Sequence, residues 1–296
     1  MDGAVAIQLP NGFWEGGMRH AEAVLRPLNG CDEEFLFEEA AGRSTARRVT
    51  ALLTRCTLRL GRLSPVSEAQ IARLAAGDRE ALLLHLRRLT FGDRMPAVVS
   101  CPGDDCGQKL DLELSASSLL APAPAETAES YETEVSSDGN SYRVRFRLPT
   151  GADQEAAAEA AGRGLQAGVR TLVGRCVTAA STAATHRSAV REVAARDLPE
   201  TVVAGLSEAM ARLDPQAEIE LAVECPSCGS RFQALLDAAS FLFEEVSGRR
   251  RDLYREVHTL ALHYHWSEAE ILGMPFRRRQ RYLGLLREAL GEEAAG

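Results

Sequence analysis

Four cysteines in two short knuckles are the residues of this chain best suited to chemistry. Cys101-Pro-Gly-Asp-Asp-Cys106-Gly and Cys225-Pro-Ser-Cys228-Gly each place two thiols around a tight turn. Zn²⁺ takes four soft ligands in a tetrahedron, and Pro restricts the backbone of such a turn. We therefore expect Cys101, Cys106, Cys225 and Cys228 to hold one structural zinc ion per chain. Two pairs of buried or redox-linked thiols are the alternative.

The two knuckles differ in how closely they match a zinc site. The second has the usual two residues between its cysteines, whereas the first has four. Four thiolates would leave no coordination position for water or substrate, so zinc here would stabilise the fold and not catalyse. Cys56 and Cys176 each lie on an apolar helical stripe, where a packed thiol is expected.

A weak internal duplication explains why the knuckles are so far apart. Four landmarks recur in the same order about 120 to 124 residues later, which predicts two structural repeats. They are Arg26, Gly30, Asp32 and Glu34 against Arg147, Gly151, Asp153 and Glu155; Leu52-Leu-Thr-Arg-Cys56 against Leu172-Val-Gly-Arg-Cys176; the two knuckles; and Ala116, Ser118 and Leu120 against Ala238, Ser240 and Leu242.

Sequence patterns in each repeat predict an α+β, helix-rich fold. Residues 45–60 and 165–180 have helical spacing, and 198–213 reads as a further helix. Ser67-Glu-Ala-Gln70 is a capping box that opens a helix ending at Gly92, and Asp138-Gly139 is a hairpin turn. Ser267-Glu-Ala-Glu270 and Pro275 begin two helices near the C-terminus.

We divide the chain accordingly into five segments, of which the two repeats are joined by one shared four-cysteine zinc site. These are an N-terminal extension (1–21), a first repeat (22–120), a linker and hairpin start (121–141), a second repeat (142–242) and a helical tail (243–296). The linker lacks large apolar residues. The tail has no counterpart in the first half, and its apolar stripes, including Leu253, Val257, Leu260 and Tyr264, are expected to dock a partner.

Composition favours an intracellular protein whose partners are proteins. The formal charge of −8 argues against a chain that coats nucleic acid, and no apolar run is long enough to span a bilayer. The first 30 residues have no charged start followed by an apolar run, so we expect a cytoplasmic protein without a membrane partner. In that reducing setting, paired cysteines more often bind metal than form disulfides.

Catalytic signatures are absent from the sequence, and we expect no enzyme. His258, His263 and His265 lie near Glu256, but apolar residues alternate with them and amphipathic packing accounts for the pattern. The basic runs at 249–251 and 277–281 provide the alternative function, a zinc-ribbon protein that binds nucleic acid through its C-terminal helices. Nearby acidic residues favour a solvated helix face.

Several longer motifs carry a family resemblance over about residues 25–285. They are Asp78-Arg-Glu-Ala-Leu-Leu-Leu-His-Leu-Arg-Arg-Leu-Thr-Phe-Gly-Asp93, Leu213-Asp-Pro-Gln-Ala-Glu-Ile-Glu-Leu221, Tyr264-His-Trp-Ser-Glu-Ala-Glu-Ile-Leu272 and Arg277-Arg-Arg-Gln-Arg-Tyr282. Together with the knuckles they resemble base plate proteins encoded with phage tails and contractile injection systems, which are similar to the T-even phage base plate hub assembly chaperone.

The resemblance implies a non-enzymatic function in building a syringe-like particle. The chain would be an assembly factor, or a minor structural component, of the base plate or hub of a phage-tail-like contractile injection system. Its partners would be base plate or hub proteins, and it would act in the cytoplasm or within the particle. A transient chaperone and a permanent subunit both remain open.

Overall fold

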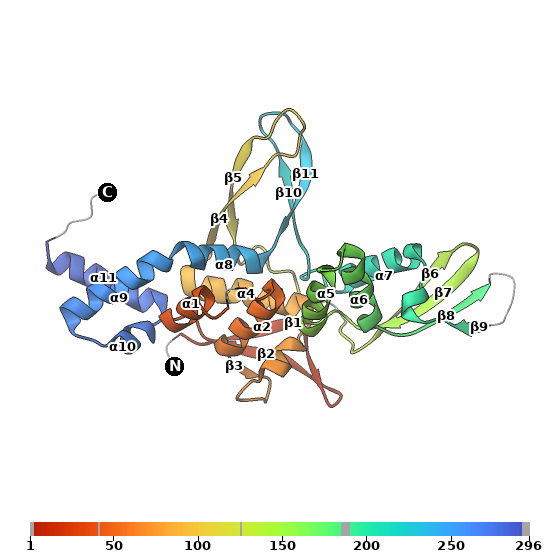
Figure 1. Ribbon diagram of the computed structural model, residues 1–296, viewed down its shortest axis with the longest axis horizontal. Helices are drawn as coiled ribbons and strands as arrows, with labels where there is room; N and C mark the ends of the chain where they lie inside the picture. Colours follow the sequence, from red (N-terminus) through yellow and green to blue (C-terminus); the bar gives the residue numbers. More distant parts are fainter. Residues whose placement is uncertain (1–2, 41, 125, 185–189, 292–296) are drawn as a thin grey trace.

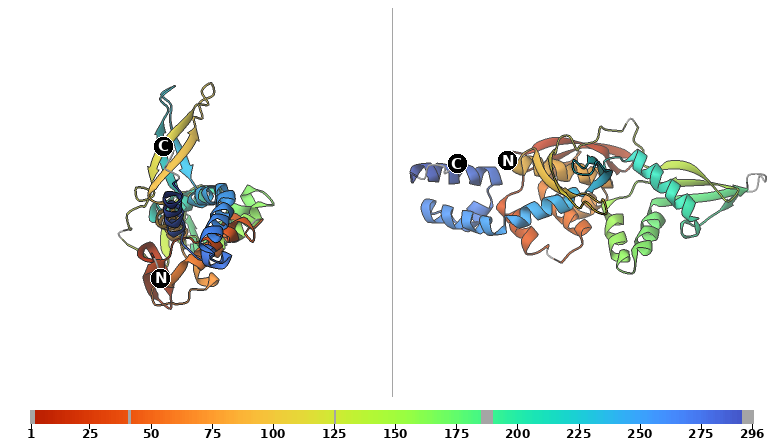
Figure 2. Two further views of the ribbon diagram at one scale, coloured as in Figure 1. Left: turned by 90° about the vertical axis from the view of Figure 1, so that its left-hand side faces the viewer. Right: turned by 90° about the horizontal axis from the view of Figure 1, so that it is seen from above.

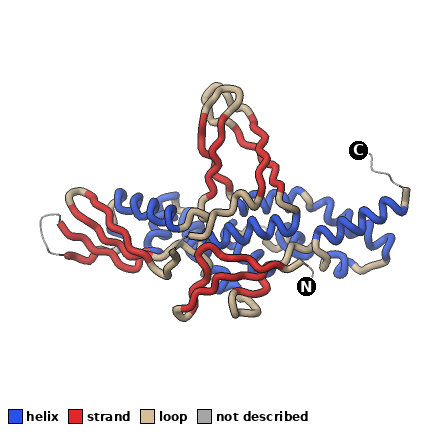
Figure 3. Tube along the Cα trace, turned by 180° about the vertical axis from the view of Figure 1, so that it is seen from behind, coloured by secondary structure: helices blue, strands red, loops and turns tan. Residues whose placement is uncertain are grey.

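A computed structural model of the chain describes residues 3–40, 42–124, 126–184 and 190–291. The molecule is a long body from which a narrow arm projects near the middle (Figure 1). Helices run through the body, while the strands form the arm and two separate sheets (Figure 3). The expected helix-rich α+β class is confirmed.

The first part of the chain forms a sheet packed against four helices. Its strands pair antiparallel in the order β1-β2-β3, with β1 at one edge. The elements are β1 (Val5–Glu15), β2 (Met18–Leu25), α1 (Gly30–Phe37), α2 (Thr45–Cys56), β3 (Thr57–Leu60), α3 (Glu68–Ala72) and α4 (Ala76–Phe91). Residues 5–15, which lie in the segment expected as an extension, therefore form a strand of this sheet.

The second part has the same kinds of elements at the other end of the body. Its four-stranded antiparallel sheet has the order β6-β7-β8-β9. The elements are β6 (Tyr131–Ser137), β7 (Asn140–Phe146), α5 (Gly151–Ala161), α6 (Leu165–Cys176), β8 (Val177–Ala184), β9 (Val190–Glu192), the 3-10 helix η1 (Ala195–Asp197) and α7 (Glu200–Leu213). Asp138 and Gly139 both have positive φ in the β6–β7 turn, which confirms the predicted hairpin.

Two hairpins form the arm, and four helices complete the body. The arm consists of β4 (Arg94–Ser100), β5 (Lys109–Ser115), β10 (Ile219–Glu224) and β11 (Arg231–Leu236). The final helices are α8 (Ala238–Gly248), α9 (Arg250–Tyr264), α10 (Glu268–Leu272) and α11 (Phe276–Ala289). The predicted capping box is present at Ser67. The two helix starts predicted at Ser267 and Pro275 are confirmed, because Ser267 also forms a capping box and Pro275 is the N-cap of α11.

Two predicted helices are too long. Residues 45–60 and 165–180 were expected to be helical throughout, but α2 ends at Cys56 and α6 at Cys176. In both cases the next residue begins a strand that pairs with a preceding strand, β3 with β2 and β8 with β7. Pairing within a sheet outweighs the helical periodicity of these short segments. The helix expected between Ser67 and Gly92 is likewise divided, into α3 and α4.

The C-terminal helices belong to the main hydrophobic core. Leu253, Val257 and Leu260 of α9 are buried in one cluster with residues of β1, α1, α2 and α4, and Tyr264 packs against it. The expectation that this stripe is free for a partner is therefore wrong, because α1 and the neighbouring tail helices cover it. Two smaller clusters form the core of the second part and the inside of the arm.

Candidate metal centre

The four predicted ligands meet at the tip of the arm. The β4–β5 and β10–β11 hairpins are separate two-stranded sheets that stand side by side (Figures 1 and 2). Each hairpin ends in one cysteine knuckle. Between the hairpins, Leu110 and Val223 form a thin buried layer together with Cys101 and Cys225. The knuckles, which are far apart in sequence, therefore close one shared apolar layer at its outer end.

Distances between the sulfur atoms fit a tetrahedral thiolate site. All four Sγ atoms lie within 4.8 Å of one another. The Sγ atom of Cys101 is 3.6 Å from that of Cys228, and that of Cys106 is 3.7 Å from that of Cys225. Zinc–sulfur bonds of about 2.3 Å in a tetrahedron would put the sulfurs about 3.8 Å apart. The seven cysteines are all unpaired, and these close contacts are far longer than a disulfide bond.

The backbone around the second knuckle favours the thiolate form of Cys228. Cys225 N–H donates to Ser230 O, and Gly229, with φ +72°, donates its N–H to Cys225 O. This turn directs the Ser230 N–H towards Cys228, which lowers the pKa of that thiol to about 6. A thiolate is the form that binds metal, so the turn favours the binding-competent state.

The first knuckle accommodates its two additional residues within a turn. Cys101 N–H donates to Gln108 O, as Cys225 N–H does to Ser230 O, and Cys106 N–H donates to Gly103 O. Gly107 has φ +56°, matching the positive φ of Gly229. An N–H of Gly103 lowers the pKa of Cys101, but burial and the other thiols outweigh it and raise that pKa to about 12. Crowded thiols of this kind must release protons when a cation binds.

The remaining cysteines lie away from this cluster. Cys56 and Cys176 are fully buried at the ends of α2 and α6, and burial raises the pKa of both. Each fits its predicted role as a packed thiol. Cys31 is half-buried in the first turn of α1.

The histidines near the C-terminus do not assemble a second site. His258, His263 and His265 are all exposed. Glu256 is buried and accepts hydrogen bonds from Arg249, Arg279 and Gln280. Across the described residues, the four cysteines of the arm are the group of potential metal ligands that lie close enough to share an ion.

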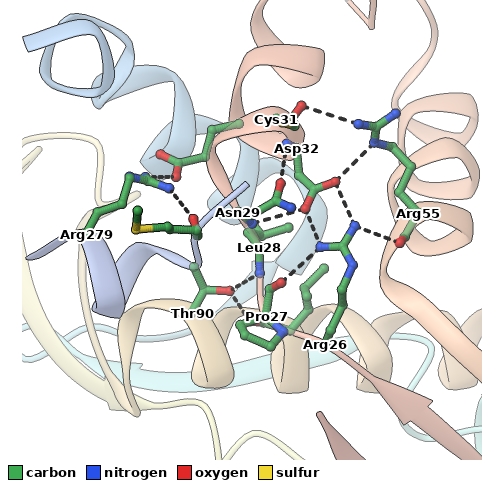
Figure 4. A network of polar contacts seen from close by, with 12 residues as sticks. Arg26, Pro27, Leu28, Asn29, Cys31, Asp32, Arg55, Thr90 and Arg279 are labelled. Atoms are coloured by element: carbon green, nitrogen blue, oxygen red, sulfur yellow. Dashed lines mark hydrogen bonds and ion pairs between the residues drawn. The ribbon is translucent and has the colours of Figure 1, made fainter. Parts of the chain in front are cut away.

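A buried aspartate holds the start of α1 (Figure 4). Asp32 lies between Arg26 and Arg55, which donate to it from two sides at 2.5 to 3.1 Å. In the second part Asp153 accepts the same set of bonds from Arg147 and Arg175 at 2.5 to 3.0 Å. In the sequence these residues are only landmarks of the predicted duplication, and the recurring order Arg, Asp, Arg is the signal for this arrangement. We call each aspartate with its two arginines a clamp.

Buried arginines and carboxylates form contacts that sequence reasoning missed. Arg279 of α11 is fully buried and is paired with Glu33 of α1 and Glu256 of α9. Asp78 of α4 is also fully buried and accepts the Asn11 N–H at 2.8 Å. A charge within a helix usually indicates a solvent-facing position, so only the tertiary contacts identify these residues.

None of the helices among the described residues is both long and apolar enough to cross a membrane.

Comparison with known proteins identifies one family. No curated protein and no solved structure gave a significant match. The profile of one family, described as T4 bacteriophage base plate protein, matches residues 22–243. This region includes both hairpins of the arm and ends within α8. The expected resemblance is confirmed, and the chain belongs to the T4 bacteriophage base plate protein family.

Proposed function

We propose that this chain is a non-enzymatic assembly factor, or a minor structural component, of the base plate or hub of a phage-tail-like contractile injection system. The family match over residues 22–243 supports a base plate role. The protein's partners would be other base plate or hub proteins, and its place of action would be the cytoplasm or the finished particle. A helix-rich body with an extended arm offers a large surface for such contacts.

One zinc ion bound by Cys101, Cys106, Cys225 and Cys228 completes the proposal. The spacing of the sulfur atoms and the small size of the apolar layer beneath them support it. Such a layer buries little surface, so the two hairpins need a further link to stay together. Four thiolates would supply that link and leave no position for a reacting molecule, in agreement with a structural role.

The duplication is part of the same proposal. We infer that residues 22–120 and 142–242 are related repeats and that each contributes one hairpin to the arm. The matching clamps around Asp32 and Asp153 support this, as do Arg26 N–H and Arg147 N–H, which donate to Cys56 O and Cys176 O at 3.0 Å. The metal then joins equivalent turns of the two repeats, at the end of the arm and away from the body.

Nucleic-acid binding is the weaker candidate. The basic runs of the C-terminal helices were its basis, but Arg249 and Arg279 are engaged with Glu33 and Glu256. Arg277 donates to the backbone carbonyls of Arg88 and Thr90. These three arginines make their hydrogen bonds and ion pairs within the body, so they have little left to offer a phosphate backbone.

Deletion of the gene, followed by analysis of particles, tests the proposed role. Cells that carry the whole gene cluster should lose assembled base plates on deletion and recover them with the wild-type chain. Mass spectrometry of purified particles separates the two forms of the proposal, because a permanent subunit remains in the particle and a transient chaperone does not. Normal particle yield after deletion would overturn the proposed function.

A further inference from the structure

Two helix pairs of the chain are copies of one another at an offset of 200 residues. Residues 67–91 contain α3 and α4, and residues 267–289 contain α10 and α11. We call them the first and second sockets. Identical residues occupy eight equivalent positions, and these are Ser67/Ser267, Glu68/Glu268, Ala69/Ala269, Ile71/Ile271, Arg79/Arg279, Leu83/Leu283, Leu86/Leu286 and Arg87/Arg287. Each begins with a capping box, and Arg79 and Arg279, at equivalent positions, are both fully buried.

Each socket holds the start of one helix from another part of the chain. In the first socket, Ala75 pairs with Thr150, the N-cap of α5, and Ala76 N–H donates to Pro149 O at 2.8 Å. In the second, Pro275 pairs with Asn29, the N-cap of α1. Thus the two sockets bind equivalent helices of the two halves in the same way.

The first residue of each bound helix is a glycine because the socket approaches so closely. A Cβ atom at Gly151 would lie 2.2 Å from the Arg79 side chain. One at Gly30 would lie 2.9 Å from the Leu272 backbone. Gly30 and Gly151 are also landmarks of the duplication. The close approach of the two sockets explains why both positions are glycine.

The two sockets differ on one face of their long helices, α4 and α11. This is the face that does not contact the bound helix. In the first socket β1 packs along α4. The Asn11 N–H of β1 donates to Asp78, and Leu82, one turn further along, is fully buried. An edge strand of a sheet therefore covers this face of α4.

No described strand covers the equivalent face of α11. Arg278 and Tyr282 take the positions of Asp78 and Leu82, but Arg278 is exposed and Tyr282 only half-buried. Together with Leu285, which is 49% exposed, they line a groove of about 840 Å³ that reaches Val5 at the start of β1. The groove thus has an apolar floor, and Arg278 and Arg281 of α11 lie along it.

We propose that this groove binds an extended, acidic segment of another base plate protein, in the position that β1 occupies on α4. The identity of the partner as a base plate protein rests on the proposed function. The strand covering α4 meets the carboxylate of Asp78, whereas an occupant here would meet arginines, so charge complementarity calls for carboxylates on the segment. Its apolar residues would cover Tyr282 and Leu285, which phosphates of a nucleic acid would leave exposed.

Site-specific cross-linking in cells tests the inference. A photoreactive benzoylphenylalanine replaces Leu285 in the full chain, or Leu262 of α9 as the matched control, which is 59% exposed outside the groove. We expect position 285 alone to cross-link to one segment of a base plate protein that carries several carboxylates, as mapped by mass spectrometry. Arg281→Glu should lower the yield about tenfold. Changing a carboxylate of the mapped segment to Lys should restore the yield.

Other outcomes overturn the inference. One kind is a cross-link from position 285 to nucleic acid, to a second copy of the chain or to a segment without carboxylates. The other is a yield at position 285 that is zero or equal to the yield at position 262. Complementation of the deletion strain separates this failure from that of the proposed function. If wild-type and Leu285→Glu chains restore base plates equally, the groove proposal fails while the base plate role stands. Thermal unfolding of the purified variant should match Leu262→Glu, because both leucines are exposed.

Discussion

The sulfur atoms of Cys101 and Cys228 lie 3.6 Å apart although the two residues are 127 positions apart in the chain. Each cysteine of one knuckle has its close partner in the other knuckle, since Cys106 likewise faces Cys225. A bound ion would therefore cross-link the hairpins and would not merely tighten one turn. The proposed zinc would therefore stabilise the arm more than the body.

The first prediction is that the purified protein contains about one zinc ion per chain. Cys228→Ser should remove most of it, because three remaining thiolates bind zinc less tightly. Elemental analysis measures the content, with Cys31→Ser as the control that keeps the metal. Hydrogen exchange should show faster exchange in β4, β5, β10 and β11 after chelation and little change in α4. A metal-free wild-type protein with four readily alkylated thiols in a stable arm would contradict this prediction.

A second prediction concerns the clamp around Asp153. Burial of this carboxyl works to raise its pKa, but hydrogen bonds from Arg147 and Thr150 outweigh it and lower the pKa to about 2 from an ordinary value of 3.8. Because the folded pKa is depressed, the stabilisation is present above about pH 4 and is lost as the pH falls towards 2.

Asp153→Asn should therefore lower the free energy of unfolding by about 2 kcal/mol at pH 7 and by less near pH 2. Denaturant unfolding at a series of pH values measures the difference. Asp32→Asn, at the equivalent clamp, should destabilise the chain at pH 7 for the same structural reason. A pH-independent effect of Asp153→Asn would show that the arginine pairs contribute nothing through charge.

The third prediction has the opposite dependence on pH. Asp78 is fully buried, and burial, with the charge of Asp214 adding to it, raises the pKa of Asp78 to about 7. A raised folded pKa means that stability is fully present below about pH 4 and is lost as the pH rises through 7. Asn at position 78 can still accept a hydrogen bond from Asn11. The free energy of unfolding of Asp78→Asn should therefore rise relative to that of wild type by on the order of 2 kcal/mol between pH 5 and pH 8. Exposed Asp111→Asn is the control, and equal shifts in both variants would refute the argument.

The fourth prediction concerns Arg279. Arg279→Met removes the positive charge between Glu33 and Glu256 and should cost about 3 to 5 kcal/mol, because two buried carboxylates lose their partner. Arg287→Met, on the exposed side of the same helix, should change stability by less than about 0.5 kcal/mol. Urea unfolding followed by circular dichroism compares them.

Truncation of the tail provides a further test. A chain that ends near Gly248 should unfold or aggregate, since it would lack the contact of Arg279 and much of the main core. Cooperative unfolding of that shorter chain would contradict the assignment of α9 to the core.

Local sequence signals determined the elements whose geometry depends on neighbouring residues. Ser67 with Gln70, Ser267 with Glu270, and Asp138 with Gly139 each define their own cap or turn, and all three form as predicted. The cysteine spacing and the order of the repeat landmarks likewise pointed to one shared cluster before any fold was known. The family resemblance depended on longer motifs and was confirmed by the match over residues 22–243.

Tertiary structure alone decided the features that depend on distant partners. The helical pattern of residues 45–60 could not reveal that Thr57 leaves the helix to pair with β2. Nor could the basic run at 277–281 reveal that Arg279 is buried while Arg278 and Arg281 face a groove. Periodicity describes one segment at a time, whereas strand pairing and burial of charge are set by the free energy of contacts between segments far apart in the chain.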